Sequence, residues 1–80
     1  MIRVLFFAQA KMLAGQPSLS LPATDAPDMT RLWENLLTRF PQLSSIRSAS
    51  RVARNGAFAG AEECFVDGDE IAIIPPVSGG

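Results

Sequence analysis

The 80-residue sequence contains no histidine and a single cysteine, Cys64. Without histidine, the chain can build neither a histidine-dependent catalytic triad nor a histidine metal site. One cysteine excludes an internal disulfide and any Cys-x-x-Cys site. Charged residues make up only 19% of the chain, and their formal net charge is −1. This balance argues against a nucleic-acid partner, because neutralising phosphates requires a basic surface.

The sequence also lacks a long run of apolar residues. Its longest apolar stretch near the N-terminus, residues 4–8, is soon followed by Gln9 and Lys11. A secretory signal peptide requires a longer apolar core, and a membrane-spanning helix requires about 20 such residues. We therefore expect a cytoplasmic protein without a membrane partner. Hydrophobic residues still make up 48% of the chain, which is typical of one small globular domain.

Periodic segments occupy the first half of the chain. Residues 1–8 are rich in β-branched and aromatic side chains, and residues 18–21 alternate polar and apolar, so both predict strands that pair antiparallel. Within residues 29–40, apolar side chains recur every three or four positions, which indicates an amphipathic helix. Asp28 is a suitable N-cap for this helix, and Pro41 ends it.

The second half predicts further strands. Residues 51–54 and 57–59 are expected to form a hairpin, because Asn55 and Gly56 between them both tolerate positive φ. The isoleucine-rich residues 70–74 predict a last strand. A right-handed crossover places this strand beside the first one and parallel to it. We therefore predict an α+β fold of the β-grasp type, in which a mixed sheet wraps on one main amphipathic helix.

One helix can cover only one face of such a sheet. If Ile71 and Ile73 face the helix, apolar side chains from the first and last strands share the uncovered face, and a side chain of the hairpin joins them. These side chains are Leu5, Phe7, Ala72, Ile74 and Phe58. An exposed apolar patch of this kind marks a partner site.

The last six residues differ in character from the domain that precedes them. Pro75 and Pro76 favour an extended chain held off the sheet. Gly79 and Gly80 carry no side chains, so the final carboxylate sits on a narrow thread that can enter a tunnel in another protein. We therefore divide the chain into a β-grasp domain at residues 1–74 and a flexible tail at residues 75–80. An ordinary frayed terminus is the alternative interpretation.

A family resemblance strengthens the functional interpretation of the tail. The run DGDEIAIIPPVSGG at residues 67–80 resembles the C-terminal signature of the MoaD family, the small subunit of molybdopterin synthase. The run IRVLFFA at residues 2–8 is similar to the first strand of that family, and Asn55 lies where the family usually has an asparagine. One departure is Arg54, where the family usually carries a small apolar residue.

This resemblance implies a ubiquitin-like fold and a sulfur-carrier role. In such proteins an E1-like (MoeB-type) adenylyltransferase uses ATP to adenylate the terminal glycine carboxylate, here Gly80. Sulfur from a donor protein then gives a thiocarboxylate. The tail, here Pro76, Val77, Ser78 and Gly79, inserts into a MoaE-type large subunit and donates sulfur to cyclic pyranopterin monophosphate. The resemblance also implies that Phe7, Phe58 and Ile74 form the partner-binding patch, and that no cofactor is bound permanently.

Other candidate sites in the sequence have simpler interpretations. The acidic residues Asp67, Asp69 and Glu70 are too close together for a calcium loop and are typical of a turn, so we expect no metal site. Cys64 is expected to be buried or incidental, and Trp33 to belong to the core.

Alternative functions remain open at this point. A ThiS-like carrier of thiazole synthesis has the same fold, although such proteins lack the PPVSGG ending. A ubiquitin-like modifier would join Gly80 to lysines of other proteins. A plain interaction domain with an inert tail is the fourth possibility.

Overall fold

The protein forms one mixed β-sheet with helices packed on it. The structure is a computed structural model that describes residues 1–76. The elements in chain order are β1 (Ile2–Phe6), α1 (Ala8–Ala14), β2 (Ser18–Leu21), η1 (Ala23–Asp25), α2 (Met29–Arg39), η2 (Pro41–Ser45), η3 (Arg47–Ala49), β3 (Arg51–Arg54), β4 (Ala57–Phe58) and β5 (Glu70–Ile74), where η marks a short 3-10 helix.

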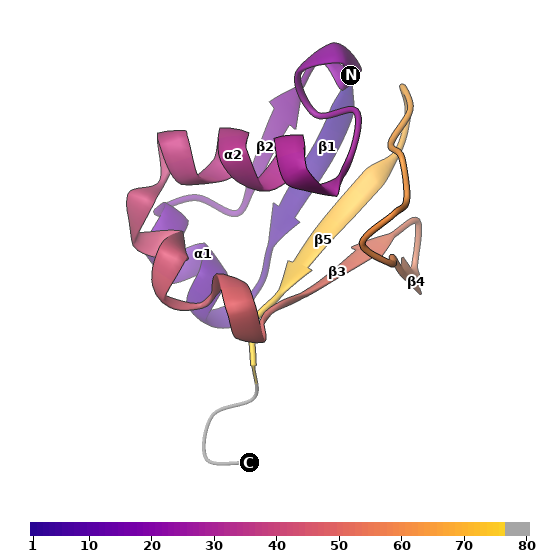
Figure 1. Cartoon of the computed structure of the whole chain (residues 1–80). Helices are drawn as coiled ribbons and strands as arrows, with labels where there is room; N and C mark the ends of the chain where they lie inside the picture. Colours follow the sequence, from indigo (N-terminus) through magenta and orange to yellow (C-terminus); the bar gives the residue numbers. More distant parts are fainter. Residues whose placement is uncertain (77–80) are drawn as a thin grey trace.

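The five strands lie in the order β2-β1-β5-β3-β4. β1 pairs antiparallel with β2 and parallel with β5, and β3 pairs antiparallel with both β5 and β4. α2 crosses one face of this sheet, and α1 lies at the end of the sheet nearer the C-terminus (Figure 1). The mixed sheet, the parallel β1–β5 pair and the single main helix confirm the predicted β-grasp fold.

The core lies between α2 and one face of the sheet. Alternation along β1 places Ile2, Val4 and Phe6 in the core, and alternation along β5 does the same for Ile71 and Ile73. From α2, the spacing of three and four brings Leu32, Trp33 and Leu36 onto the same interface, so the prediction that Trp33 belongs to the core is confirmed. The predicted assignment of strand faces is therefore correct.

Local signals in the sequence set the ends of α2 and the tight hairpin. The Asp28 side chain accepts a hydrogen bond from the backbone N–H of Arg31 at 2.8 Å, which makes it the N-cap that the sequence predicts. Asn55 and Gly56 have φ angles of 50° and 87°, as a tight β3–β4 turn requires. None of the helices within residues 1–76 is long and apolar enough to cross a bilayer.

The first strand is shorter than predicted. Residues 1–8 were expected to be extended, but β1 ends at Phe6, and Phe7 is the N-cap of α1. The chain turns there because Ala8 adopts a positive φ of 47°, which is incompatible with a continuing strand. Phe7 is therefore placed at the rim of the sheet, where a helix begins.

Replacing Ile73 by valine should lower the free energy of unfolding by about 0.5–1.5 kcal/mol, because it removes one methylene from a fully buried position. Ile74→Val is the matched control, since the neighbouring residue lies on the opposite sheet face and is only half-buried. Urea unfolding of both variants measures the difference. Equal losses for the two variants would contradict this assignment of faces.

Candidate functional site on the uncovered sheet face

The sheet face opposite α2 carries a continuous set of apolar side chains. Strand register places Phe58 of β4 beside Ala53, Ala53 beside Ala72, and Ala72 beside Leu5. Such neighbours across strands point to the same side of the sheet. This row, together with Ile74, is called the outer face below. Phe58 is 64% exposed, and Leu5, Ala72 and Ile74 are half-buried.

A groove opens at the C-terminal end of the outer face. Its walls come from the N-terminus of α1 and from the chain that leaves β5; they are Phe7, Ala8, Gln9, Met12, Ile74, Pro75 and Pro76. Phe7 is 49% exposed and Met12 is 81% exposed, so the groove presents apolar surface to solvent. Pro75 is buried and Pro76 is exposed, so contact with the domain extends one residue beyond β5. The groove therefore borders the start of the predicted tail.

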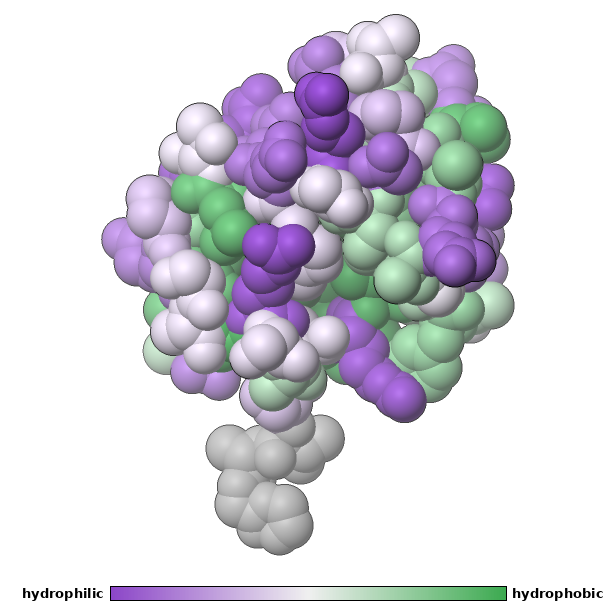
Figure 2. All heavy atoms as spheres, viewed as in Figure 1, coloured by the Kyte–Doolittle hydropathy of each residue, from purple (hydrophilic) through white to green (hydrophobic). Residues whose placement is uncertain are grey.

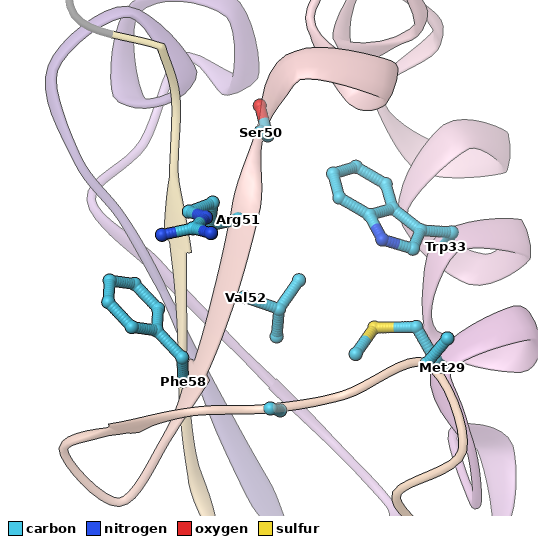
Figure 3. A pocket seen from close by; sticks show the side chains of 8 residues that line it. Met29, Trp33, Ser50, Arg51, Val52 and Phe58 are labelled. Carbon is cyan, nitrogen blue, oxygen red and sulfur yellow. The ribbon is translucent and has the colours of Figure 1, made fainter.

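Two of the three predicted patch residues, Phe7 and Ile74, line this groove. Phe58 lines a different and smaller groove beside β3, together with Arg51, Val52 and Trp33 among others. Figure 3 shows Arg51 and Phe58 on one side of β3 and Val52 on the other side, toward Trp33 and Met29 of α2. Arg51 therefore lies between Phe58 and Ile74, its partner in β5.

The side of the molecule that carries α2 has mixed polarity. Figure 2 shows hydrophilic residues over much of the side where α2 lies, while hydrophobic residues gather toward the edge formed by β3 and β4. The predicted tail residues Val77, Ser78, Gly79 and Gly80 lie outside the described residues.

A buried polar network holds the start of β5 in place. Asp69 is only 6% exposed, and its carboxylate accepts hydrogen bonds from Arg54 Nε at 2.8 Å, Asn55 Nδ2 at 2.9 Å and the Val66 backbone N–H at 2.9 Å. Asn55 in turn accepts a hydrogen bond from the Glu70 backbone N–H at 2.9 Å. The β3–β4 hairpin and the turn before β5 are therefore joined through side chains far apart in the sequence.

This network gives Arg54 a structural role. The Arg54 guanidinium also contacts the Glu63 carboxylate at 3.4 Å, so it bridges two acidic side chains. The hydrogen bond to the Asp69 carboxylate raises the pKa of Arg54 above its usual value. The pairing of Arg54 with Asp69 could not be predicted from the sequence. The run Asp67-Gly68-Asp69 is typical of a turn, so nothing in it indicates that Asp69 binds a distant arginine.

The same contacts lower the pKa of Asp69. The Val66 N–H contributes most, followed by Asn55 and, more weakly, Arg54, whereas desolvation acts in the opposite direction. A carboxylate with a lowered pKa stabilises the fold above its unfolded pKa, and this contribution is lost as the pH falls through its folded pKa. Asp69 is therefore an acid-sensitive support for the start of β5.

The remaining candidates are the acidic turn and Cys64. The Asp67-Gly68-Asp69 segment forms a turn in which Gly68 has a φ of 92°, and residues 1–76 contain no group of three or more cysteine or carboxylate side chains arranged to hold a metal ion. Cys64 is exposed, so of the two expectations, a buried or an incidental cysteine, the first is wrong and the second stays a prediction. Its backbone forms an isolated bridge with Asp28, which leaves the side chain outside the core.

Comparison with known proteins bears on what this face and tail do. Residues 4–80 match the ThiS family. The chain is 37% identical to a molybdopterin synthase sulfur carrier subunit of Arabidopsis thaliana, over 99% of this chain and 82% of the relative. The chain belongs to this family of sulfur carrier subunits. The resemblance of residues 2–8 and 67–80 to the MoaD family predicted this membership, and the prediction is thus confirmed.

Solved structures confirm the ubiquitin-like fold of this MoaD-type chain. The small archaeal modifier protein SAMP1 of Haloferax volcanii superimposes with a TM-score of 0.84 at 28% identity, over 99% of this chain and 98% of the other. A chain from the complex of subunits 1 and 2 of molybdopterin-converting factor from Helicobacter pylori superimposes with a TM-score of 0.70 at 24% identity, over 99% and 97% of the two chains. This second likeness concerns the fold alone.

Asp69→Asn should lower the melting temperature at pH 7, because the neutral amide loses the charge-assisted bonds to Val66, Asn55 and Arg54. The difference from the wild type should shrink below about pH 4, where the wild-type carboxylate begins to take up a proton in the unfolded chain. Thermal unfolding across a pH series measures the difference in melting temperature between the wild type and Asp69→Asn. Glu62→Gln, at an exposed position, is the control. A difference that stays constant at acid pH would contradict the role of Asp69.

Proposed function

We propose that the C-terminal carboxylate of Gly80 carries sulfur for the synthesis of molybdopterin. The observation that carries this proposal is the family match, which extends through residue 80 and so includes the Gly-Gly end. The sequence supports it because carrying sulfur on a backbone carboxylate requires no histidine, no cysteine pair and no metal from this chain.

The chemistry proceeds in two substitutions, the first at the α-phosphorus of ATP and the second at the carbonyl carbon of Gly80. A carboxylate is a poor acyl donor, so the activating enzyme joins it to the α-phosphate of ATP and releases pyrophosphate. A persulfide of the donor protein then attacks the acyl-adenylate and displaces AMP, which gives an acyl disulfide. A second thiol attacks the donor's sulfur atom, so that a disulfide forms there and the thiocarboxylate is released. The thiocarboxylate donates its sulfur to cyclic pyranopterin monophosphate. ATP is consumed by the activating enzyme, and this chain holds no permanent cofactor.

Three partners follow from this sequence of steps. They are an E1-like (MoeB-type) adenylyltransferase, a sulfur donor protein and a MoaE-type large subunit that receives the tail. The groove lined by Phe7, Ile74 and Pro76 supports such docking, because it offers apolar surface where the chain leaves the domain. We propose that Phe7, Ile74 and Phe58 contact the large subunit while residues 76–79 enter it, and that these reactions take place in the cytoplasm.

A ubiquitin-like modifier is the second candidate. The likeness to the modifier SAMP1 of Haloferax volcanii at 28% identity favours it. In that case the Gly80 acyl group would pass to a lysine amine and form an isopeptide bond. The activation step is the same, so only the fate of the acyl group separates the two functions. A ThiS-like carrier of thiazole synthesis would differ only in its large partner.

Incubating the chain with a competent activating enzyme, ATP and a sulfur source should raise its intact mass by one oxygen-to-sulfur exchange. Intact-protein mass spectrometry measures the change. Deletion of Gly80 should abolish it, and a variant extended by one residue after Gly80 should also remain unmodified. An unchanged wild-type mass would refute the sulfur-carrier function, and lysine-linked adducts in extracts would favour the modifier.

Phe7→Asp should weaken binding to the large subunit by about tenfold or more, because a charge replaces an exposed aromatic side chain in the docking groove. Titration of the folded variant against the isolated large subunit measures the loss. Val66→Asp is the matched control, because Val66 is 55% exposed but lines neither groove. Wild-type affinity for Phe7→Asp would count against this docking surface.

A further inference from the structure

Two arginines lie on the outer side of the sheet. Arg3 of β1 is at the far end, in register with Glu70, whereas Arg51 lies among the apolar side chains of the outer face. Arg51 is the first residue of β3, is exposed, and pairs in register with Ile74 of β5. Arg51 and Ala53 alternate with Val52, so Arg51 shares the outer face with Ala53 while Val52 points into the core. Arg51 therefore lies within the proposed docking surface, beside the strand from which the tail departs.

The Arg51 side chain rests on an aromatic ring. The central carbon of its guanidinium lies 4.8 Å from the centroid of the Phe58 ring, in a cation–π contact. Figure 3 shows the two side chains next to each other on the outer face. This contact holds the guanidinium over the surface and leaves its N–H groups available to a partner.

Within residues 1–76, Arg51 forms no ion pair. The side-chain ion pairs of this part of the chain join Arg31 to Glu34, and Arg54 to Glu63 and Asp69. Arg54, three residues away, thus has two carboxylates, whereas the Arg51 guanidinium contacts only an aromatic ring. The two arginines of β3 differ accordingly: Arg54 supports the fold, whereas Arg51 faces outward with no carboxylate partner among residues 1–76.

Docking of the outer face against another protein would remove water from the Arg51 guanidinium. Burying a charge without a partner is strongly unfavourable, and a hydrogen-bonded carboxylate on the facing protein offsets this cost. The planar fork of an arginine suits two parallel bonds to one carboxylate. A partner that is apolar throughout would fit this face poorly.

We propose that the large subunit presents an aspartate or glutamate to Arg51, within an otherwise apolar contact surface. This inference rests on the proposed function. We assign the carboxylate to the large subunit and not to a transient partner. Stable complexes between enzyme subunits bury larger and more hydrophobic interfaces than transient complexes do. A guanidinium without a partner charge is therefore least tolerated in the interface with the large subunit. Arg51 is then a specificity-determining residue, and Phe58 positions it.

Binding of the full chain to the isolated large subunit tests this pairing. Arg51→Met should weaken binding by about tenfold or more, and Arg51→Glu by a further factor of about ten, because a like charge then faces the carboxylate. Arg51→Lys should fall between the wild type and Arg51→Met. Arg39→Glu is the matched control, since it makes the same charge change at the exposed end of α2. Circular dichroism establishes that each variant is folded.

A charge exchange identifies the partner residue. Reversing the matching acidic residue of the large subunit to arginine should restore the binding of Arg51→Glu to near the wild-type level. The affinity of the wild type should fall with rising salt, and that of Arg51→Met should fall less steeply. Binding of Arg51→Glu equal to that of Arg39→Glu would overturn the inference.

The remaining outcomes separate this inference from the proposed function. If the wild type binds the large subunit and Phe7→Asp does not, while Arg51→Glu binds normally, the inference alone fails. If Arg51→Glu binds normally but no longer forms the thiocarboxylate, the carboxylate belongs to the activating enzyme and the inference also fails. If the wild type neither gains sulfur nor binds the large subunit, the proposed function fails.

Discussion

The parallel pairing of β1 with β5 is the contact on which the rest of the structure depends. It joins the two ends of the described chain at the middle of the sheet and aligns Val4 with Ile71 and Phe6 with Ile73. These four side chains are buried beneath α2, so one interaction closes the core and sets the direction of β5. Because Pro75 and Pro76 follow β5 directly, the same pairing determines where the chain leaves the domain (Figure 1).

The Asp69 network supports this arrangement from the other end of β5. Arg54 and Asn55 come from the β3–β4 hairpin, and their bonds to Asp69 hold the turn that starts the last strand. A buried carboxylate is tolerated here because it accepts three hydrogen bonds, one from a guanidinium. The hairpin thus both positions β5 and, through Phe58 and Arg51, forms part of the outer face.

The uncovered face of the sheet links the fold to its function. A single helix leaves that face without a covering layer, because no other helix or strand within residues 1–76 lies over it. Under the proposed function, the exposed apolar side chains serve docking, because a carrier must bind the proteins that load and unload it. Arg51 then restricts which partner can dock, since a cation on an apolar face requires an anionic side chain on the facing protein.

The sequence by itself determined the elements whose signals are local. Spacing of apolar residues specified α2, Asp28 its start, Asn55-Gly56 the hairpin, and alternation the buried faces of β1 and β5, because each depends on neighbours within a few positions along the chain. Phe7 and Phe58 could be predicted as exposed, and Ile74 as facing away from the core, for the same reason. Only the tertiary structure decided that Phe7 caps α1 and that Phe58 lies beside a different groove from Phe7. It also decided that the Asp69 carboxylate binds Arg54, which leaves Arg51 for the proposed contact with a partner. These features depend on contacts between residues far apart in the sequence, whose distances no local pattern encodes.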